Sequence, residues 1–314
     1  MADELKWAYQ DHWRTPSAKG PINQWASVAH MDRFVRQIAA VGFSGIQTFD
    51  RNLYLLSEMF GSVPRYEEFL RERGIEKIVD LFHARHYDVR NGSPHVRETH
   101  DTLLEECRVI MELCDGLAVE HLIVMPAALY IDVEPVTDDQ IKAAAELWSR
   151  VGEMTLSYGV KLGAHHEFFC GIRNLDELEK FYEWSDPRYV FFFFDTAQHA
   201  IAGLDPVALY ERYHERVTGF HFKDARTADV DDDYRKPPDA ELMARTTARW
   251  FYEMGTADGI VDFPALVRAM KKHGYEGWVG VEHDKANFGG SYTESTAVAG
   301  WYAQNVLAPI YEAV

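Results

Sequence analysis

The sequence predicts a (β/α)8 barrel formed by one domain of 314 residues. Apolar, β-prone segments alternate with amphipathic helical segments along the chain, which is the pattern of α/β proteins with a parallel sheet. Residues 189–199 read YVFFFFDTAQH, and a continuous apolar run of this length predicts a strand buried on both faces. Several strands end in acidic residues or histidines, as strands do around a barrel mouth. An open doubly wound sheet is disfavoured, because no glycine-rich phosphate loop follows the first strand.

The first half of the chain contains four predicted strands separated by helices. Gly42 ends the first helix, and the next helical segment is interrupted between Gly61 and Pro64. The predicted strands are 6–13, 45–50, 75–85 and 121–126, and the predicted helices are about 30–41, 53–73 and 96–117.

The second half repeats the alternation. Thr137 opens a helix three residues before Gln140, Pro206 occupies the first position of another helix, and Gly274 ends a third. A polar insertion at about 226–259 follows the seventh strand. The predicted strands are 160–167, 189–195, 217–224 and 277–284, and helices begin near 137, 174, 205 and 262, with a last helix at about 293–311.

Charge and cysteine content restrict the class of protein. The formal net charge of −18, from 32 basic and 50 acidic residues, argues against binding to nucleic acid or to an anionic membrane face. Three scattered cysteines do not form a disulfide framework. The first six residues contain no apolar signal core, and no window approaches the length of a membrane span. We therefore expect a cytoplasmic protein.

Four polar residues stand at the ends of the late strands, namely Glu167, Asp195, His221 and Glu282. In a barrel these strand ends face one mouth. Each residue alone could be an ordinary polar group of a loop, but four at successive strand ends favour a site. Carboxylates with one neutral imidazole suit one divalent cation, with Mn²⁺ the first candidate and Mg²⁺ or Co²⁺ the others. Without a cation, three converging carboxylates would repel one another.

Two further residues of these strands can serve catalysis. His165 points the same way as Glu167, and Lys223 the same way as His221. His165 is a candidate base, and Lys223 is a candidate cation for a developing oxyanion. A salt bridge from Lys223 to Asp224 or to a neighbouring residue is the alternative. Other histidines that could line a substrate pocket are His199, His83, His86 and His12.

Four segments of the second half resemble the xylose-isomerase-like superfamily of barrels, which includes sugar phosphate isomerases and epimerases. They are FDTAQH at 194–199, GFHFKD at 219–224, GTADGIVDF at 255–263 and GYEGWVGVE at 274–282. The resemblance implies that the metal ligands are Glu167, Asp195, His221 and Glu282. One extra residue before His199 departs from the family pattern. On the fifth strand, many members carry a glutamate near His165, so His165 is the rival of Glu167 as ligand.

A histidine two residues before the glutamate is more similar to the eliminating members. These are the inosose dehydratases and the catalytic α-subunits of bacterial C-glycoside deglycosidases. The insertion, through 242–254, also resembles the dehydratase pattern. The first hypothesis is therefore a metal-dependent lyase acting on a keto sugar or 3-oxo-glycoside. It would remove the proton beside the carbonyl and expel the β group.

Three other functions are weighed against the lyase. A ketose isomerase or epimerase shares the first half-reaction but returns the proton. A phosphodiesterase acting on abasic DNA is disfavoured by the net charge, and a non-catalytic sugar-binding barrel would not need this cluster. A deglycosidase α-subunit would require a small β-subunit, and higher oligomers are open. Trp250, Phe251 and Tyr252 could pack against another chain or within this one.

Overall fold

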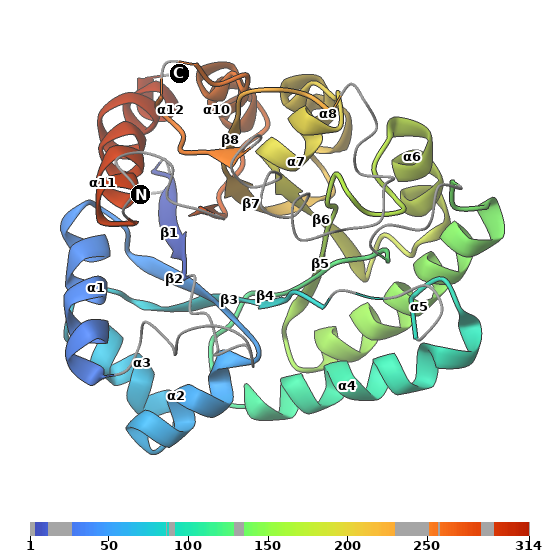
Figure 1. Ribbon diagram of the computed structural model, residues 1–314, viewed down its shortest axis with the longest axis horizontal. Helices are drawn as coiled ribbons and strands as arrows, with labels where there is room; N and C mark the ends of the chain where they lie inside the picture. Colours follow the sequence, from blue (N-terminus) through green and yellow to red (C-terminus); the bar gives the residue numbers. More distant parts are fainter. Residues whose placement is uncertain are drawn as a thin grey trace.

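The barrel prediction is confirmed by a computed structural model of the protein. The structure describes residues 4–11, 27–85, 87, 92–128, 135–229, 251–256, 258–283 and 292–313. Eight parallel strands close in the order β1-β10-β7-β6-β5-β4-β3-β2, and helices surround them (Figure 1). The barrel strands are β1 Lys6–Gln10, β2 Gly45–Phe49, β3 Lys77–His83, β4 His121–Val124, β5 Lys161–His165, β6 Val190–Asp195, β7 Val217–Phe222 and β10 Trp278–Val281.

The helices follow the predicted alternation. Gly61 adopts a φ of 83° and ends α2, so the interrupted segment forms two helices. The Thr137–Gln140 capping box opens α5. The helices are α1 Val28–Ala40, α2 Asn52–Phe60, α3 Val63–Arg71, α4 His100–Leu113, α5 Asp138–Ser157, α6 Leu175–Trp184, α8 Pro206–Tyr213, α10 Phe263–Lys272, α11 Tyr292–Tyr302 and α12 Ala308–Ala313, with a 3-10 turn at Arg97–Thr99.

Three local features differ from the sequence-based expectation. A short helix, α7 Thr196–Ile201, begins directly after β6. The last helix is divided by a π-helical segment, Ala303–Leu307, and Pro309 just after it lacks the N–H of a regular helical turn. The strands are shorter than predicted, and β5 ends at His165, so Glu167 lies in the loop beyond it.

The segment after β7 begins and ends in a small antiparallel pair. Strand β8, Asp224–Ala225, pairs with β9, Phe251–Tyr252. Residues 230–250 of the predicted insertion lie outside the described residues, so its bounds stay a prediction.

Side chains alternate across the barrel wall, and this alternation selects the residues that face the axis. In β6, Phe193 points inward, toward the rings of His121 and His221, whereas Phe192 points outward, toward Tyr182. Gly219 on β7 leaves room for Phe193, because a Cβ there would lie 2.4 Å from the Phe193 ring. The large Phe193 side chain thus occupies the space that the glycine at position 219 leaves open.

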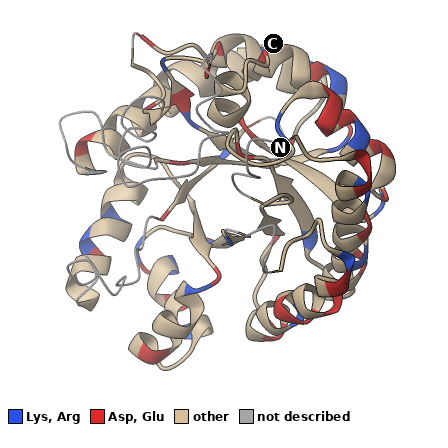
Figure 2. Ribbon diagram, turned by 45° about the vertical axis from the view of Figure 1, so that its right-hand side comes forward, with Lys and Arg blue, Asp and Glu red and all other residues tan. Residues whose placement is uncertain are grey.

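Charged residues of both signs lie on the outer helices (Figure 2). Acidic residues are interspersed with basic ones along the outer helices (Figure 2). Among the described residues, no helix combines the length and apolar character that crossing a membrane requires.

A buried polar layer crosses the barrel below Phe193. The Gln47 amide donates to Asp80 over 2.6 Å, His121 Nδ1 lies 2.6 Å from the other Asp80 oxygen, and His121 Nε2 lies 2.9 Å from the Thr218 hydroxyl. Asp80 is 1% exposed. Such a layer is favourable only while each polar group keeps its partner.

We therefore predict that Asp80→Ala destabilises the fold by roughly 2–4 kcal/mol, because it leaves a buried amide and a buried imidazole without their acceptor. Thermal unfolding followed by circular dichroism measures the change. Asp115→Ala, at an exposed position after α4, is the matched control and should change stability by less than about 0.5 kcal/mol. Equal midpoints for the two variants would contradict the structural role of the layer.

Candidate metal centre

Four ligating side chains converge at the carboxyl end of the barrel. His165 ends β5, Asp195 ends β6, His221 lies on β7, and Glu282 directly follows β10. These four strands are neighbours in the barrel, and each residue offers one ligating atom within 4.8 Å of the others. All four side chains are buried. The structure thus brings together three of the four predicted ligands, with His165 in the place expected for Glu167.

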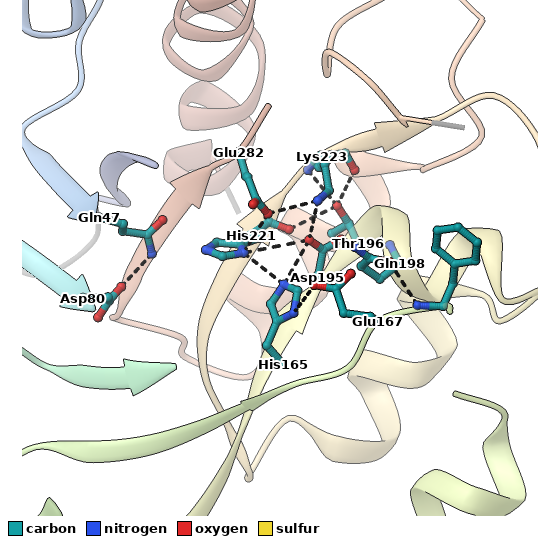
Figure 3. Close-up of polar contacts among 11 residues, drawn as sticks. Gln47, Asp80, His165, Glu167, Asp195, Thr196, Gln198, His221, Lys223 and Glu282 are labelled. Atoms are coloured by element: carbon teal, nitrogen blue, oxygen red, sulfur yellow. Dashed lines mark hydrogen bonds and ion pairs between the residues drawn. The ribbon is translucent and has the colours of Figure 1, made fainter. Parts of the chain in front are cut away.

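The closest approaches define the centre of this cluster (Figure 3). His165 Nε2 lies 3.2 Å from Asp195 Oδ2 and 3.1 Å from His221 Nδ1. His221 Nδ1 lies 2.9 Å from Glu282 Oε2. Two carboxylate oxygens and two imidazole nitrogens therefore face one another.

Lys223 supplies a positive charge at the same oxygens. Its Nζ lies 3.0 Å from Glu282 Oε2 and 3.2 Å from Asp195 Oδ2. The proposed inward direction of Lys223 is therefore observed. Asp224 does not take the ammonium, because its carboxylate accepts the N–H groups of Ala225 and Val261 instead. Burial raises the pKa of Asp224 to about 6.

The charges in the cluster compensate for burial. Burial alone would raise the pKa of Asp195, but Lys223 and His165 lower it. Burial would likewise raise the pKa of Glu282, but Lys223 and His221 hold it well below its usual range. Both carboxylates therefore remain ionised and able to bind a cation.

Asp195 is oriented by the helix that it caps. Its Oδ1 accepts the Gln198 N–H over 2.8 Å at the start of α7, which leaves Oδ2 directed into the cluster. The Gln198 side chain accepts the N–H of Phe168, and so links α7 to the loop after β5. The Thr196 hydroxyl accepts the Lys223 N–H and donates to the Lys223 carbonyl. Helix α7 thus fixes both Asp195 and the backbone of Lys223.

His165 and Glu167 form a second charged pair at the mouth. His165 Nδ1 lies 3.2 Å from Glu167 Oε1, although the N–H direction is not aligned on that oxygen. Burial would lower the pKa of His165, but Glu167 and Asp195 together raise it to about 10. A divalent cation at the cluster would oppose this shift by repelling the proton.

The remaining histidines considered for substrate binding lie in different places. His83 Nδ1 contacts Asp50 Oδ2 at 2.9 Å, and the neighbouring Phe82, not His83, contacts the rings of His165 and His221. His199 packs among Phe192 and Phe194, where burial lowers its pKa to about 3. His12 and His86 lie outside the described residues. His83 and His199 thus project away from the cluster, as strand and helix periodicity direct them.

Several residues around the site were not assigned from the sequence. Phe82 forms an apolar wall, and Thr196 and Gln198 orient the charged residues. Phe251, after the insertion, lies with its ring centroid 4.3 Å from Lys223 Nζ and packs on Phe168. The inward register of Phe82 could have been found by alternation from β3, but the pairing of Phe251 with Lys223 depends on the chain return after residue 250.

The donors fit one divalent cation. A set of two nitrogens and two oxygens suits Mn²⁺, Co²⁺ or Zn²⁺, and the buried carboxylates supply the compensating charge. The fold itself is shared with solved structures. The IOLI protein, solved with a bound zinc atom, has a TM-score of 0.68 and 15% identity, with 98% of this chain and 99% of that chain covered. A sugar phosphate isomerase/epimerase from Parabacteroides distasonis gives a TM-score of 0.67 at 18% identity, covering 99% and 96%.

The family is decided by a sequence match along most of the chain. Residues 35–303 match the family model described as Xylose isomerase-like TIM barrel. The chain belongs to this family.

Curated relatives of the chain include inosose dehydratases. The protein of that name from Lacticaseibacillus casei is 28% identical over 178 residues, which cover 57% of this chain and 58% of the relative. The inosose dehydratase of Bacillus velezensis is 24% identical over 240 residues, covering 75% and 70%. The chain thus spans little more than half the length of the first of these relatives.

Lys223 should weaken cation binding, because its ammonium approaches the two oxygens that would hold the ion. We predict that Lys223→Met raises Mn²⁺ affinity by about tenfold or more, since like charges a few ångströms apart repel. Isothermal titration calorimetry measures the affinity. Lys142→Met, at an exposed position of α5, is the matched control and should leave it unchanged. An unchanged or lower affinity in Lys223→Met would show that the ammonium does not act on the ion site.

Proposed function

We propose that this protein is a divalent-metal-dependent lyase that acts on a keto sugar, such as an inosose, or on a 3-oxo-glycoside. The observation that carries the proposal is the convergence of His165, Asp195, His221 and Glu282 beside Lys223. The similarity to inosose dehydratases supports elimination as the reaction. Mn²⁺ is the proposed ion, and the zinc of the IOLI structure supports a divalent ion in this fold.

The chemistry divides into a carbonyl part and a proton part. A divalent ion held by these side chains would polarise the substrate carbonyl and so acidify the adjacent C–H. That proton passes to a base of the protein, and its electron pair forms the C=C bond conjugated to the carbonyl. The β substituent departs with its bonding pair and takes up a proton. The substrate thereby loses the atoms of the β substituent and one proton, whereas isomerisation would leave its molecular formula unchanged.

Glu167 is the proposed acceptor of the proton. Its Oε1 lies 3.2 Å from His165 Nδ1, so the carboxylate stands next to a residue that would hold the ion. His165, the base expected from the sequence, is instead proposed as a ligand of the ion. A placed base typically contributes about 10²–10⁴-fold in rate. Lys223 is positioned to face the negative charge that develops on the substrate oxygen.

Apolar walls strengthen these interactions. Phe82, Phe193 and Phe251 contact the imidazoles or the ammonium of the cluster, and all three are buried. Displacing water from around fixed charges lowers the local dielectric constant and increases their effect on a developing charge. The protein can thus hold its base and the ammonium of Lys223 in fixed positions before the substrate arrives.

A C-glycoside deglycosidase activity would involve a further chain. We propose that, in this case, a small β-subunit covers a surface near the insertion in a cytoplasmic complex. Phe251 does not provide that surface, because it is 3% exposed within this chain. Trp250 lies outside the described residues.

Product analysis tests the function. Protein loaded with Mn²⁺ should convert an inosose into a product lighter by one water, as seen by mass spectrometry, and the chelator-treated protein should not. Asp195→Asn should abolish turnover by removing a charged oxygen of the cluster, while Asp115→Asn, at the exposed position after α4, should retain it.

A product of unchanged mass would identify an isomerase or epimerase instead. Products from 3-oxo-glycosides alone would select the deglycosidase branch, with the partner chain as the next component to add. Activity that survives complete metal removal would contradict the proposal.

A further inference from the structure

Two residues at the end of β5 and in the loop after it could bind the cation, and the positions of their nitrogen and oxygen atoms indicate different roles. His165 is the last residue of β5, whereas Glu167 stands two residues later in the loop. We infer that His165 binds the cation through Nε2, and that Glu167 orients this imidazole from its far side. The inference rests on the metal dependence of the proposed function.

The position of Nε2 supports ligation by His165. This nitrogen lies 3.2 Å from Asp195 Oδ2 and 3.1 Å from His221 Nδ1, so it shares a centre with the oxygen and nitrogen of two other ligands. The four atoms that gather within 4.8 Å belong to His165, Asp195, His221 and Glu282. Within the described part of the chain, Glu167 is not a member of this group. Its carboxylate lies next to the other ring nitrogen of His165, with Oε1 3.2 Å from Nδ1 (Figure 3).

The second nitrogen of His165 explains the position of Glu167. Nδ1 is buried and has no aligned hydrogen-bond partner among the described residues, and Glu167 Oε1 approaches it to 3.2 Å. Ligating histidines usually direct their second nitrogen toward a carboxylate or carbonyl, which fixes the tautomer and the ring orientation. A proton held on Nδ1 beside Glu167 leaves the Nε2 lone pair free for the cation.

The ligand set has a consequence for the choice of ion. With His165 as a ligand the site offers two nitrogens and two oxygens, and nitrogen ligands shift the preference from Mg²⁺ toward Mn²⁺, Co²⁺ or Zn²⁺. Glu167 Oε2 is buried without a hydrogen-bond partner in the described structure, and so remains available to accept the substrate proton.

Pulsed electron paramagnetic resonance of Mn²⁺-loaded protein counts the nitrogen atoms bound to the ion, independently of turnover. The wild type should show two nitrogens, and ¹⁵N-histidine labelling should shift both signals. His165→Gln should show one nitrogen and much weaker Mn²⁺ binding.

Glu167→Gln should keep both nitrogens and weaken binding by about 10–100-fold, the usual effect of losing an orienting partner. Glu98→Gln, at an exposed position, should match the wild type in both measurements.

One nitrogen in the wild type would overturn the inference, as would loss of Mn²⁺ from Glu167→Gln with its retention in His165→Gln. The wild-type count and Glu167→Gln decide the matter even where His165→Gln fails to fold. The proposed function is tested separately by product analysis, and its outcome does not depend on how many nitrogen atoms bind Mn²⁺. Wild-type protein that binds no Mn²⁺ would remove the metal dependence and the inference together.

Discussion

The site depends on the cost of burying two carboxylates at one point. Asp195 and Glu282 are 0% and 4% exposed, and their oxygens would repel each other strongly in this environment. Lys223, His165 and His221 supply the compensating positive or dipolar groups within 3.2 Å. A divalent cation would perform the same compensation with higher charge. The surrounding structure keeps the two carboxylates together although they repel each other and would be better solvated in water.

The fold provides that restraint through neighbouring strands and one short helix. Alternation across β5, β6 and β7 turns His165, Asp195 and His221 toward the axis, and the parallel pairing brings their ends to one level. Helix α7 then fixes Asp195 through its cap and clamps the backbone of Lys223 through Thr196. The carboxyl end of the barrel carries the reactive groups, whereas the polar layer at Asp80 and His121 holds the strands together below it.

Much of this arrangement follows from local sequence. The apolar run of β6 and the polar residues at successive strand ends were enough to predict the barrel and the inward direction of Asp195, His221 and Lys223. Strand length was less predictable, because apolar and polar residues both continue past the last ladder bond. The early end of β5 at His165 therefore changes which residue reaches the cluster. The contact of His121 with Asp80 joins residues of two strands, so the local sequence around His121 does not predict it.

Contacts between distant segments were not predictable from one sequence. Phe251 approaches Lys223 only because the chain returns through β9 to pair with β8. The aromatic residues of this segment had two interpretations, and for Phe251 the structure selects burial within its own chain. His199 likewise follows Asp195 closely in sequence, but the turn of α7 directs it among the phenylalanines of the outer face of β6.

The most direct test of the metal centre is anomalous diffraction from crystals soaked in Mn²⁺. One strong peak should lie within coordination distance of Asp195, His221 and Glu282, at the carboxyl end of the barrel. A peak elsewhere would contradict the assignment of these residues as a metal centre. The absence of a peak at this position would also contradict it, if the protein binds Mn²⁺ in solution.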